Sequence, residues 1–385
     1  MSLSAATVLA AAMLTASPDT GEGAPFPSTL ASPKVYLVPL SGQMGTDISM
    51  QLVDIVIEDV RKQKPDIIVY ALKSADIDRN DYLKNDNPME FGMPDIEKYR
   101  DMVKKLHEDL RDVPQVMWVE DSVGFASLMS LGWPHLYMKS DARLYGLSRV
   151  AALAGGWQDA DVAAKMLAAW TGIGKGILQQ GGYPLELGDA MIFPEKTLSV
   201  KFDGRAVVWL TDTTGSWVVD ANDKDATANF NAALAEDTGL ADGLADSLED
   251  LMFLLGYREF TKVESGEKLA KQYVDDWRKA LERCEEWMRD ASEVEDSVAG
   301  FGKRKSLYEK VVGAQKQFPA VEARMQRMGL PGRMQLELEI DNIKKEIQRA
   351  REAEKANRNG GGGGGGGGGT GRGLGGGGFG GRRGS

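Results

Sequence analysis

The sequence is poor in residues on which several common functions depend. It has one cysteine, Cys284, and two histidines, His107 and His135, among 385 residues. A single cysteine cannot form a disulfide within the chain, which excludes a disulfide-stabilised scaffold. Because these three side chains are far apart in the sequence, they indicate no transition-metal cluster, and we expect no metal and no cofactor.

Basic residues are also in the minority. The chain has 46 Lys and Arg against 57 Asp and Glu, a formal net charge of -11. A nucleic-acid-binding domain would have a basic face, so we do not expect nucleic acid as a partner. With 42% hydrophobic residues the chain can bury a sizeable core, and its length has room for about two domains plus tails.

Long apolar runs are missing too. No segment approaches the roughly 20 apolar residues of a membrane helix, so we expect no transmembrane helix in the mature chain. Ala5–Ala16 has the length of a signal-peptide hydrophobic region, but no Lys or Arg precedes it. Residues 1–33 are interpreted as a signal-like leader and linker. If the leader is a signal peptide, the protein is exported to the periplasm or the extracellular space; otherwise it is cytoplasmic.

From Lys34 the pattern becomes regular α/β. Short apolar runs predict strands at Val35–Leu40, Asp66–Leu72 and Val116–Val119, and amphipathic segments predict helices at Asp47–Lys62 and Asp95–Arg111. Strands and helices that alternate at this spacing favour a parallel sheet with right-handed crossovers.

The third strand leads into a tight turn that holds Ser122 and Gly124. A small-residue helix, Phe125–Leu131, should follow, and then a second strand that ends at Gly146. Several hydrolase folds place a nucleophile on such a strand-to-helix turn, because the turn exposes the hydroxyl. The same turn is also ordinary α/β architecture.

The order of these segments resembles the ClpP/crotonase superfamily, most closely its NfeD-type and signal-peptide-peptidase-A-type serine proteases. Ser122-Val-Gly124 matches the Ser-Ala-Gly of that family, and Ala142 and Gly146 match the residues that close its motif. Residues 235–251 are similar to the segment that ends such domains. The resemblance covers about residues 34–256 and implies a repeated ββα core.

A serine nucleophile requires a base. His107 lies on a charged helix and is expected at the surface, while His135 lies in a Trp-Pro-His turn where a structural role is expected, so a Ser-His-Asp triad is not predicted. The resemblance implies a Ser-Lys dyad instead, with Lys165 in a helix similar to the lysine helix of NfeD-type proteases. Lys175 is the reserve candidate.

The surroundings of Lys165 support two interpretations. It is the one lysine in the otherwise apolar run from Val162 to Trp170, and burial there would favour the neutral amine that a general base needs. Alternatively, Lys165 extends from an amphipathic helix to solvent, as most helical lysines do.

The predicted oxyanion site departs from the family. The resemblance implies backbone N–H donors at Val123 and near Ser74 and Ala75, where active members have glycines. Leu72–Asp78 contains no glycine and two acids, and Asp121 directly precedes the serine. Carboxylates oppose a developing oxyanion, and loss of one donor costs about 2.7–4 kcal/mol. A catalytically degenerate protein is therefore a serious alternative.

After the lysine helix, Lys196–Phe202 and Ala206–Leu210 predict a β-hairpin accessory to the core, and Trp217 begins a possible third strand. Residues 257–358 repeat apolar side chains with 4-3 spacing, which predicts three coiled-coil helices. The breaks should fall at 299–302 and 329–332, with a kink at Pro319.

Two further features belong to this end of the chain. Cys284 occupies an apolar seam position of the predicted coiled coil, so we expect a buried structural thiol. Residues 359–385 are almost all glycine with a few arginines and should be disordered.

Three functions remain open. The first is a serine protease acting on a protein or peptide substrate, with Ser122 and Lys165 as its dyad. The second is a catalytically degenerate scaffold that forms a homo-oligomer through the coiled coil. The third, crotonase-type acyl-CoA chemistry, leaves the serine without a role.

Overall fold

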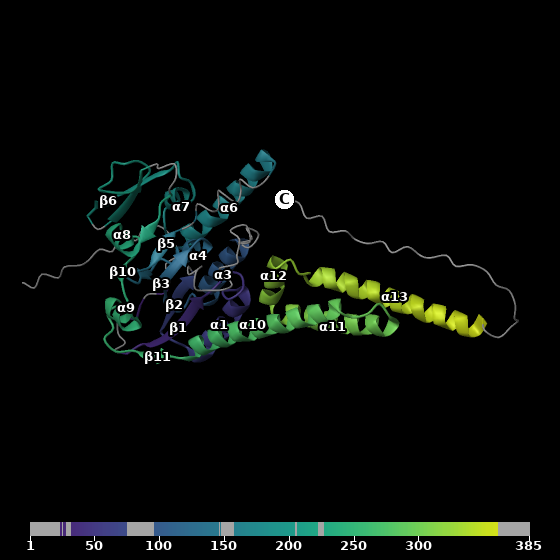
Figure 1. The fold of residues 1–385 in the computed structure, drawn as a ribbon. Helices are drawn as coiled ribbons and strands as arrows, with labels where there is room; N and C mark the ends of the chain where they lie inside the picture. Colours follow the sequence, from purple (N-terminus) through teal and green to yellow (C-terminus); the bar gives the residue numbers. More distant parts are fainter. Residues whose placement is uncertain are drawn as a thin grey trace, which may run out of the picture.

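The structure is a computed structural model, and it describes residues 24, 26–27, 32–74, 96–145, 147, 158–204, 206–221 and 227–360. Its α/β body carries a small second sheet on one side and a long helical arm on the other (Figure 1). None of the described helices is long and apolar enough to cross a membrane. The predictions for the glycine-rich tail, and for nearly all of the leader, concern residues outside these ranges.

The main sheet confirms the predicted parallel arrangement. Its strands follow the spatial order β10 (Gly243–Leu244), β4 (Leu136–Met138), β3 (Gln115–Val123), β2 (Ile67–Ser74), β1 (Lys34–Ser41) and β11 (Thr261–Val263). All neighbours on this path are parallel. β11 pairs with β1 although it lies beyond residue 256, where the family resemblance ends.

The segment after Ser122 contains two short strands where one was predicted. β4 ends at Met138, and the chain turns where the Ala142 N–H donates to the Lys139 carbonyl at 3.0 Å. β5 (Arg143–Tyr145) then pairs with the end of β3 on one side and with β9 (Phe230–Asn231) on the other.

Alternating side chains of the central strands divide the core into two layers. Tyr36, Val38 and the side chains on the same face of the neighbouring strands pack under helices α1 (Met50–Gln63), α3 (Ile96–Asp109) and α10 (Ser265–Ser292). Val35, Leu37 and the side chains that share the opposite face of the sheet pack against α9 (Leu248–Leu254). Both faces of the central strands are therefore covered, as a parallel sheet requires.

Helix α1 begins three residues later than predicted. Ser49 is its N-cap and accepts the Leu52 N–H at 3.3 Å. Asp47, the predicted start, is buried in the loop before the helix, where its carboxylate accepts the Gln43 N–H at 2.9 Å. Asp47, which was predicted to start the helix, therefore holds the loop at the carboxyl end of β1 instead.

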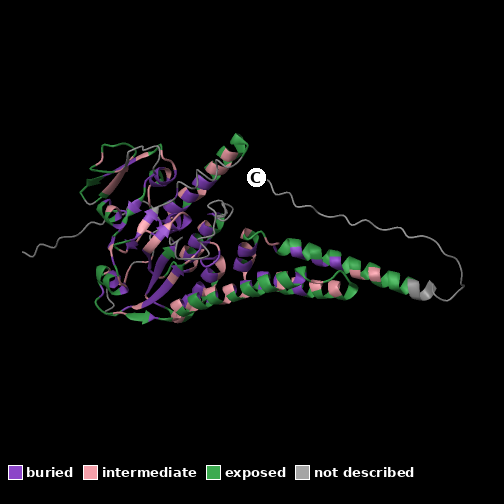
Figure 2. Cartoon of the chain, viewed as in Figure 1, coloured by how far each residue is buried: buried purple, intermediate pink, exposed green. Residues whose placement is uncertain are grey.

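Helix α6 (Ala160–Gln180) belongs to the body only along its second half. There Gly174 lies against Leu128 of α4 (Phe125–Ser130), and α7 (Leu185–Ile192) packs alongside. Residues 160–169 are exposed or half-buried, and this end of the helix projects from the body (Figure 2).

The predicted hairpin and its third strand are confirmed. β6 (Thr197–Asp203) pairs antiparallel with β7 (Ala206–Leu210) and with β8 (Trp217–Ala221). Helix α8 (Ala232–Asp237) then connects β9 of the main sheet to β10.

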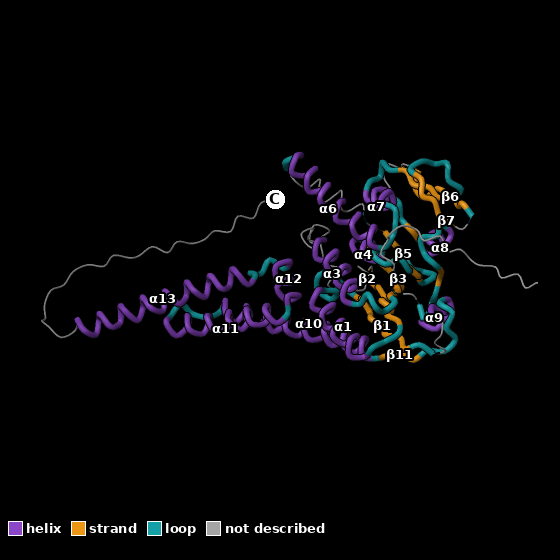
Figure 3. Tube along the Cα trace, turned by 180° about the vertical axis from the view of Figure 1, so that it is seen from behind, coloured by secondary structure: helices purple, strands orange, loops and turns teal. Residues whose placement is uncertain are grey.

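Four helices make up the C-terminal region where three were predicted. They are α10, α11 (Val298–Gln317), α12 (Pro319–Arg327) and α13 (Arg333–Gly360). α11 packs against both α10 and α13, so the periodic apolar faces meet within one chain (Figure 3). Pro319 occupies the first turn of α12, where a backbone N–H has no partner within the helix and its absence costs nothing. The proline therefore separates α11 from α12.

The first predicted break in this region is wrong. Residues 299–302 lie inside α11, whose N-cap Ser297 accepts the Gly300 N–H at 3.0 Å. The chain turns at 293–297 instead. Ser297 caps the start of α11 by accepting a backbone N–H there, so the glycines at 300 and 302 lie inside the helix and do not end it. The second predicted break, at 329–332, does separate α12 from α13.

Candidate functional site

Ser122 lies at the carboxyl edge of the parallel sheet. It is the penultimate residue of β3, opposite Ser74 of β2 and Leu144 of β5. Gly124 follows with φ 70°, a left-handed value that glycine adopts without strain, and α4 begins at the next residue. The strand, turn and helix predicted around this serine are therefore present.

The Ser122 hydroxyl is held inside the protein. The residue is 0% exposed, and its Oγ donates to the Arg143 carbonyl oxygen at 3.0 Å. The Ser127 hydroxyl lies 3.1 Å from the same Oγ. Because the single Ser122 proton points to the carbonyl, Ser127 is the donor of that second hydrogen bond. In this arrangement Ser122 is not aligned to transfer its proton to a base.

An ion pair lies beside the serine. Arg143 Nε donates to Asp121 Oδ1 at 2.9 Å, and its Nη2 donates to Oδ2 of the same carboxylate. A second pair joins Lys139 and Glu120 at 2.8 Å. The Asp121 charge expected to oppose an oxyanion is thus balanced by a bidentate guanidinium.

The region of the expected oxyanion donors is only partly described. Ser74 lies opposite Ser122 on the neighbouring strand, and its hydroxyl donates to the Gly42 carbonyl at 2.6 Å. Val123 is half-buried and pairs in register with Tyr145. Ala75 and the two acids after it lie outside the described residues. The structure therefore brings Ser74, Ser122 and Val123 to one edge of the sheet.

Lys165 does not have the burial that its interpretation as a general base requires. The residue is exposed, in the projecting half of α6, and no hydrogen bond connects it to Ser122 within the described part of the chain. The apolar neighbours that suggested burial, Val162 and Met166, are themselves exposed or half-buried. The reason is geometric, since the helix extends beyond the body that would cover them.

Lys175, the reserve candidate, has a structural partner. Its Nζ lies 2.7 Å from Asp189 Oδ1 of α7, and both side chains are partly buried. This pair helps to attach α7 to α6, so a proton-accepting role for Lys175 would first require the pair to separate.

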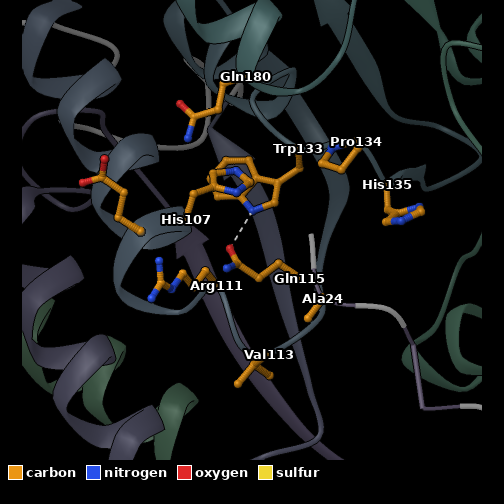
Figure 4. Close-up of a pocket in the computed structure, with 10 residues that line it drawn as sticks. Ala24, His107, Arg111, Val113, Gln115, Trp133, Pro134, His135 and Gln180 are labelled. Carbon is orange, nitrogen blue, oxygen red and sulfur yellow. Dashed lines mark hydrogen bonds between the residues drawn. The ribbon is translucent and has the colours of Figure 1, made fainter. Parts of the chain in front are cut away.

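His107 is not the solvated surface residue that its charged helix suggested. Its Nε2 lies 2.9 Å from the Gly132 carbonyl, and its ring packs against that of Trp133 with the centroids 5.1 Å apart and the planes tilted by 33° (Figure 4). Burial lowers the pKa of the imidazole. His107 packs beside Gln115, at the opposite end of β3 from the serine, and it cannot serve as the base.

His135 also lies away from Ser122. Its Nδ1 is 3.3 Å from Asp242 Oδ2, and its ring contacts Phe26 edge-on at 4.9 Å. Both contacts attach the loop before β4 to neighbouring segments.

Two residues of the site were not singled out from the sequence. Ser127 and Arg143 both contact Ser122, one through its hydroxyl and the other through its backbone carbonyl. The sequence signal for Ser127 was its position five residues after Ser122 in a helix of small residues. Arg143 had a weaker signal, as the one basic residue in the strand that closes the motif.

Within the described residues, no group of three or more His, Cys, Asp and Glu side chains could hold a metal ion.

No protein-family model matches the chain, and no curated protein matches it. Similar solved structures include 1510-N, a membrane-bound stomatin-specific protease, as a mutant in complex with a substrate peptide. That likeness has a TM-score of 0.35 at 12% identity and covers 58% of this chain and 80% of the other. A structure titled as a protease specific for a stomatin homolog from Pyrococcus horikoshii has a TM-score of 0.29 at 12% identity, covering 58% and 79%. A peptidase from Plasmodium falciparum has a TM-score of 0.29 at 12% identity, covering 55% and 95%.

Proposed function

We propose that the chain is a serine peptidase in which Ser122 is the nucleophile and Lys165 the general base. The observation that carries the proposal is the position of Ser122, at the carboxyl edge of a parallel sheet and directly before the Gly124 turn. Sites of α/β proteins lie at this edge, because strand ends and loops converge there.

The described arrangement corresponds to a resting form. The Ser122 proton is donated to the Arg143 carbonyl, so the hydroxyl must rotate about its Cβ–Oγ bond before that proton can point to a base. Ser127 can hold the oxygen during that rotation, since its hydroxyl already lies 3.1 Å away. The hydroxyl is then free to transfer its proton to a base.

Lys165 must lose its exposure to act as that base. A general base must be neutral, and burial is what disfavours the charged form of a lysine. Its helix end carries Val162 and Met166, which are apolar and incompletely covered. A second copy of the chain that covers this end would bury the amine and the apolar side chains together.

The reaction then follows from these groups. Ser122 Oγ bonds to the peptide carbonyl carbon while its proton passes to the neutral Lys165 amine. Backbone N–H groups at Val123 and near Ser74 and Ala75 stabilise the oxyanion. The peptide C–N bond breaks, the departing amine takes the proton from Lys165, and water then hydrolyses the acyl-serine ester through the same base.

A second function, a non-catalytic scaffold, is favoured by one observation. Ser122 is fully buried and donates to a backbone carbonyl, while Lys165 is exposed and Lys175 is paired with Asp189. In such a protein the hydroxyl would contribute to stability, and the helical arm would provide the contacts for assembly.

Labelling with a fluorophosphonate probe separates the two functions. The peptidase proposal expects labelling of the wild type that is lost in Ser122→Ala and strongly reduced in Lys165→Ala. Ser130→Ala is the matched control, because Ser130 is equally buried in the adjacent helix, and among the described residues its hydroxyl donates to the Ser127 carbonyl and not to Ser122. Absence of Ser122-dependent labelling across about pH 6–9 would leave the scaffold function.

Mixing two inactive variants tests the role of a second copy. If Lys165 acts between chains, Ser122→Ala mixed with Lys165→Ala should recover part of the wild-type labelling. If Lys165 acts within its own chain, the mixture should remain as weakly labelled as Lys165→Ala alone.

A further inference from the structure

The loop that follows β1 holds the end of β2, the strand beside Ser122. The Gly42 N–H donates to the Lys73 carbonyl at 3.0 Å, and the Gly42 carbonyl accepts the Ser74 hydroxyl at 2.6 Å. Ser74 in turn lies opposite Ser122 in the sheet. Both backbone polar groups of Gly42 therefore bind the last two residues of β2, one strand away from the proposed nucleophile.

The first of these hydrogen bonds orients a whole peptide group. A peptide unit is planar and trans, so its C=O and its N–H point in opposite directions. The Lys73 carbonyl is directed to Gly42 after β1, and the N–H of the same unit, that of Ser74, therefore points to the other side, toward β3. This N–H belongs to the region proposed above to stabilise the oxyanion. The position of Gly42 thus sets the direction of that donor relative to Ser122.

Asp47 fixes the position of Gly42. Its carboxylate accepts the Gln43 N–H at 2.9 Å, and it lies so close to Gly42 that a Cβ on the glycine would collide with Oδ2. The Asp47 side chain is buried, and a buried carboxylate keeps its charge only where hydrogen bonds and a cation compensate it. The conformation of the loop therefore depends on the cation that reaches Asp47.

That cation comes from the helical arm. Helix α10 runs beside β1 and α1 (Figure 1), and Arg278 Nη2 donates to both oxygens of Asp47 at 3.0 Å. Hydrogen bonds between ionised groups are roughly twice as strong as neutral ones. Arg278 therefore holds the carboxylate in the position where it meets Gly42.

We propose that Arg278 is a positioning residue of the candidate site. From the arm it holds Asp47 against Gly42. Gly42 in turn orients the peptide group that carries the Ser74 N–H beside Ser122. This inference rests on the peptidase function proposed above, and it adds that the docking of α10 on the loop controls the reactivity of the serine. A partner that displaced α10 would slow the reaction without contacting the substrate.

The kinetics of fluorophosphonate labelling test the proposal. Ser122 Oγ displaces fluoride from phosphorus while its proton passes to the base, and the phosphoryl oxygen takes the place of the oxyanion. Because loss of an oxyanion donor costs about 10²–10³ in rate, its misorientation in Arg278→Gln should lower the maximal labelling rate constant about tenfold. The half-saturating probe concentration should change less than about twofold, since the donor acts in the transition state. Arg278→Lys keeps the cation and should recover most of the rate.

Tyr273→Phe is the matched control. Tyr273 also joins α10 to this loop, because its hydroxyl donates to the Thr46 carbonyl at 3.1 Å and contacts Ser49 Oγ at 2.6 Å. Loss of the hydroxyl loosens the same junction but leaves the contacts between Asp47 and Gly42, so the labelling rate constant should stay within about twofold of the wild type. Circular dichroism at the labelling temperature verifies that each variant is folded.

Asp47→Asn breaks the same ion pair without leaving a buried charge unpaired, so it keeps the test valid if Arg278→Gln does not fold. It should also lower the rate constant, and adding Arg278→Gln to it should lower the rate no further, because both changes remove one contact. Equal rates for the wild type and Arg278→Gln, an equal fall in Tyr273→Phe, or effects that multiply in the double variant would overturn the proposal and leave the peptidase function intact. Absence of Ser122-dependent labelling in the wild type would overturn both.

Discussion

Arg278 Nη2 lies 3.0 Å from both carboxylate oxygens of Asp47, and this ion pair joins the helical arm to the loop that follows β1. Asp47 is 1% exposed, whereas Arg278 reaches the pair from α10 with its side chain partly exposed. The same loop supplies the Gly42 carbonyl that accepts the Ser74 hydroxyl beside Ser122. The arm and the candidate site are thus connected through a few residues.

Replacing Arg278 should destabilise the protein. Arg278→Gln leaves the Asp47 carboxylate buried without its cation. Because Arg278 itself is partly exposed, we expect a loss of about 2–4 kcal/mol of unfolding free energy, slightly less than for a fully buried pair. Urea denaturation at neutral pH measures the loss. Arg283→Gln, an exposed position on the same helix, should remain within about 0.5 kcal/mol of the wild type. Equal midpoints for the two variants would contradict the importance of the pair.

The buried Asp47 carboxyl should also make stability depend on pH. Burial raises its folded-state pKa above the ordinary value of 3.8, against the lowering effects of the Gln43 N–H and of Arg278. A folded pKa above the unfolded one means that protonated Asp47 stabilises the fold. This contribution is fully present below about pH 3.8 and is lost as pH rises through the folded pKa.

Asp47→Asn keeps a neutral side chain at every pH, so the variant should gain stability relative to the wild type as pH rises through that window. Urea unfolding at a series of pH values from acidic to neutral measures the difference. A free-energy difference that stays constant, or that moves in favour of the wild type, would show that the ion pair outweighs burial.

Gly42 should tolerate no side chain. Its φ is 102°, and an added Cβ would lie 2.3 Å from Asp47 Oδ2. Gly42→Ala should therefore cost more than about 2 kcal/mol, because strain and displacement of the carboxylate add together. Gly204→Ala is the control, since Gly204 also has a positive φ, 63°, but no atom within 4 Å of the new Cβ. It should cost about 1 kcal/mol. Thermal unfolding of both variants compares the two costs.

Cys284 should report on unfolding of the arm. Its thiol is buried in α10, and burial raises its pKa to about 12. At about pH 8 only about one thiol in ten thousand is then ionised, so a disulfide reagent should not react with the folded protein. Reaction should appear in urea together with loss of helical circular dichroism. Ser292→Cys, an exposed position on the same helix, should react at once in buffer. Rapid reaction of Cys284 in folded protein would show that the arm opens locally.

Much of the body could be predicted from local sequence. Runs such as Val35–Leu40 and Asp66–Leu72 are apolar along their whole length, and only strands covered on both faces require this. The turn at Ser122 and Gly124 was recognisable because a left-handed glycine separates β3 from α4. These features depend on neighbours in the chain, which a sequence pattern records directly.

The candidate site was less predictable, because it depends on what covers each element. Lys165 lies in an apolar run, but exposure is decided by where α6 leaves the body, and no local pattern encodes that. His107 has charged neighbours and was assigned to the surface, yet its own ring turns toward Trp133. The 4-3 spacing identified helices in the arm without indicating that α11 would pack between α10 and α13.

The seam between α11 and α13 gives the clearest test of the arm. Leu336 is 1% exposed in this seam, while Leu338, two residues later on α13, is 60% exposed. Leu336→Ala should reduce the unfolding free energy of the arm by about 2–4 kcal/mol through lost burial and a residual cavity, whereas Leu338→Ala should change it by less than about 0.5 kcal/mol. Both substitutions place the same residue, alanine, within one turn of the helix, so helix propensity cancels in the comparison. Thermal unfolding followed by far-ultraviolet circular dichroism, with limited proteolysis of the arm, measures the difference. Equal losses would mean that α13 does not pack on α11 in solution, and a larger loss for Leu338→Ala would place its packing surface on the opposite face of the helix.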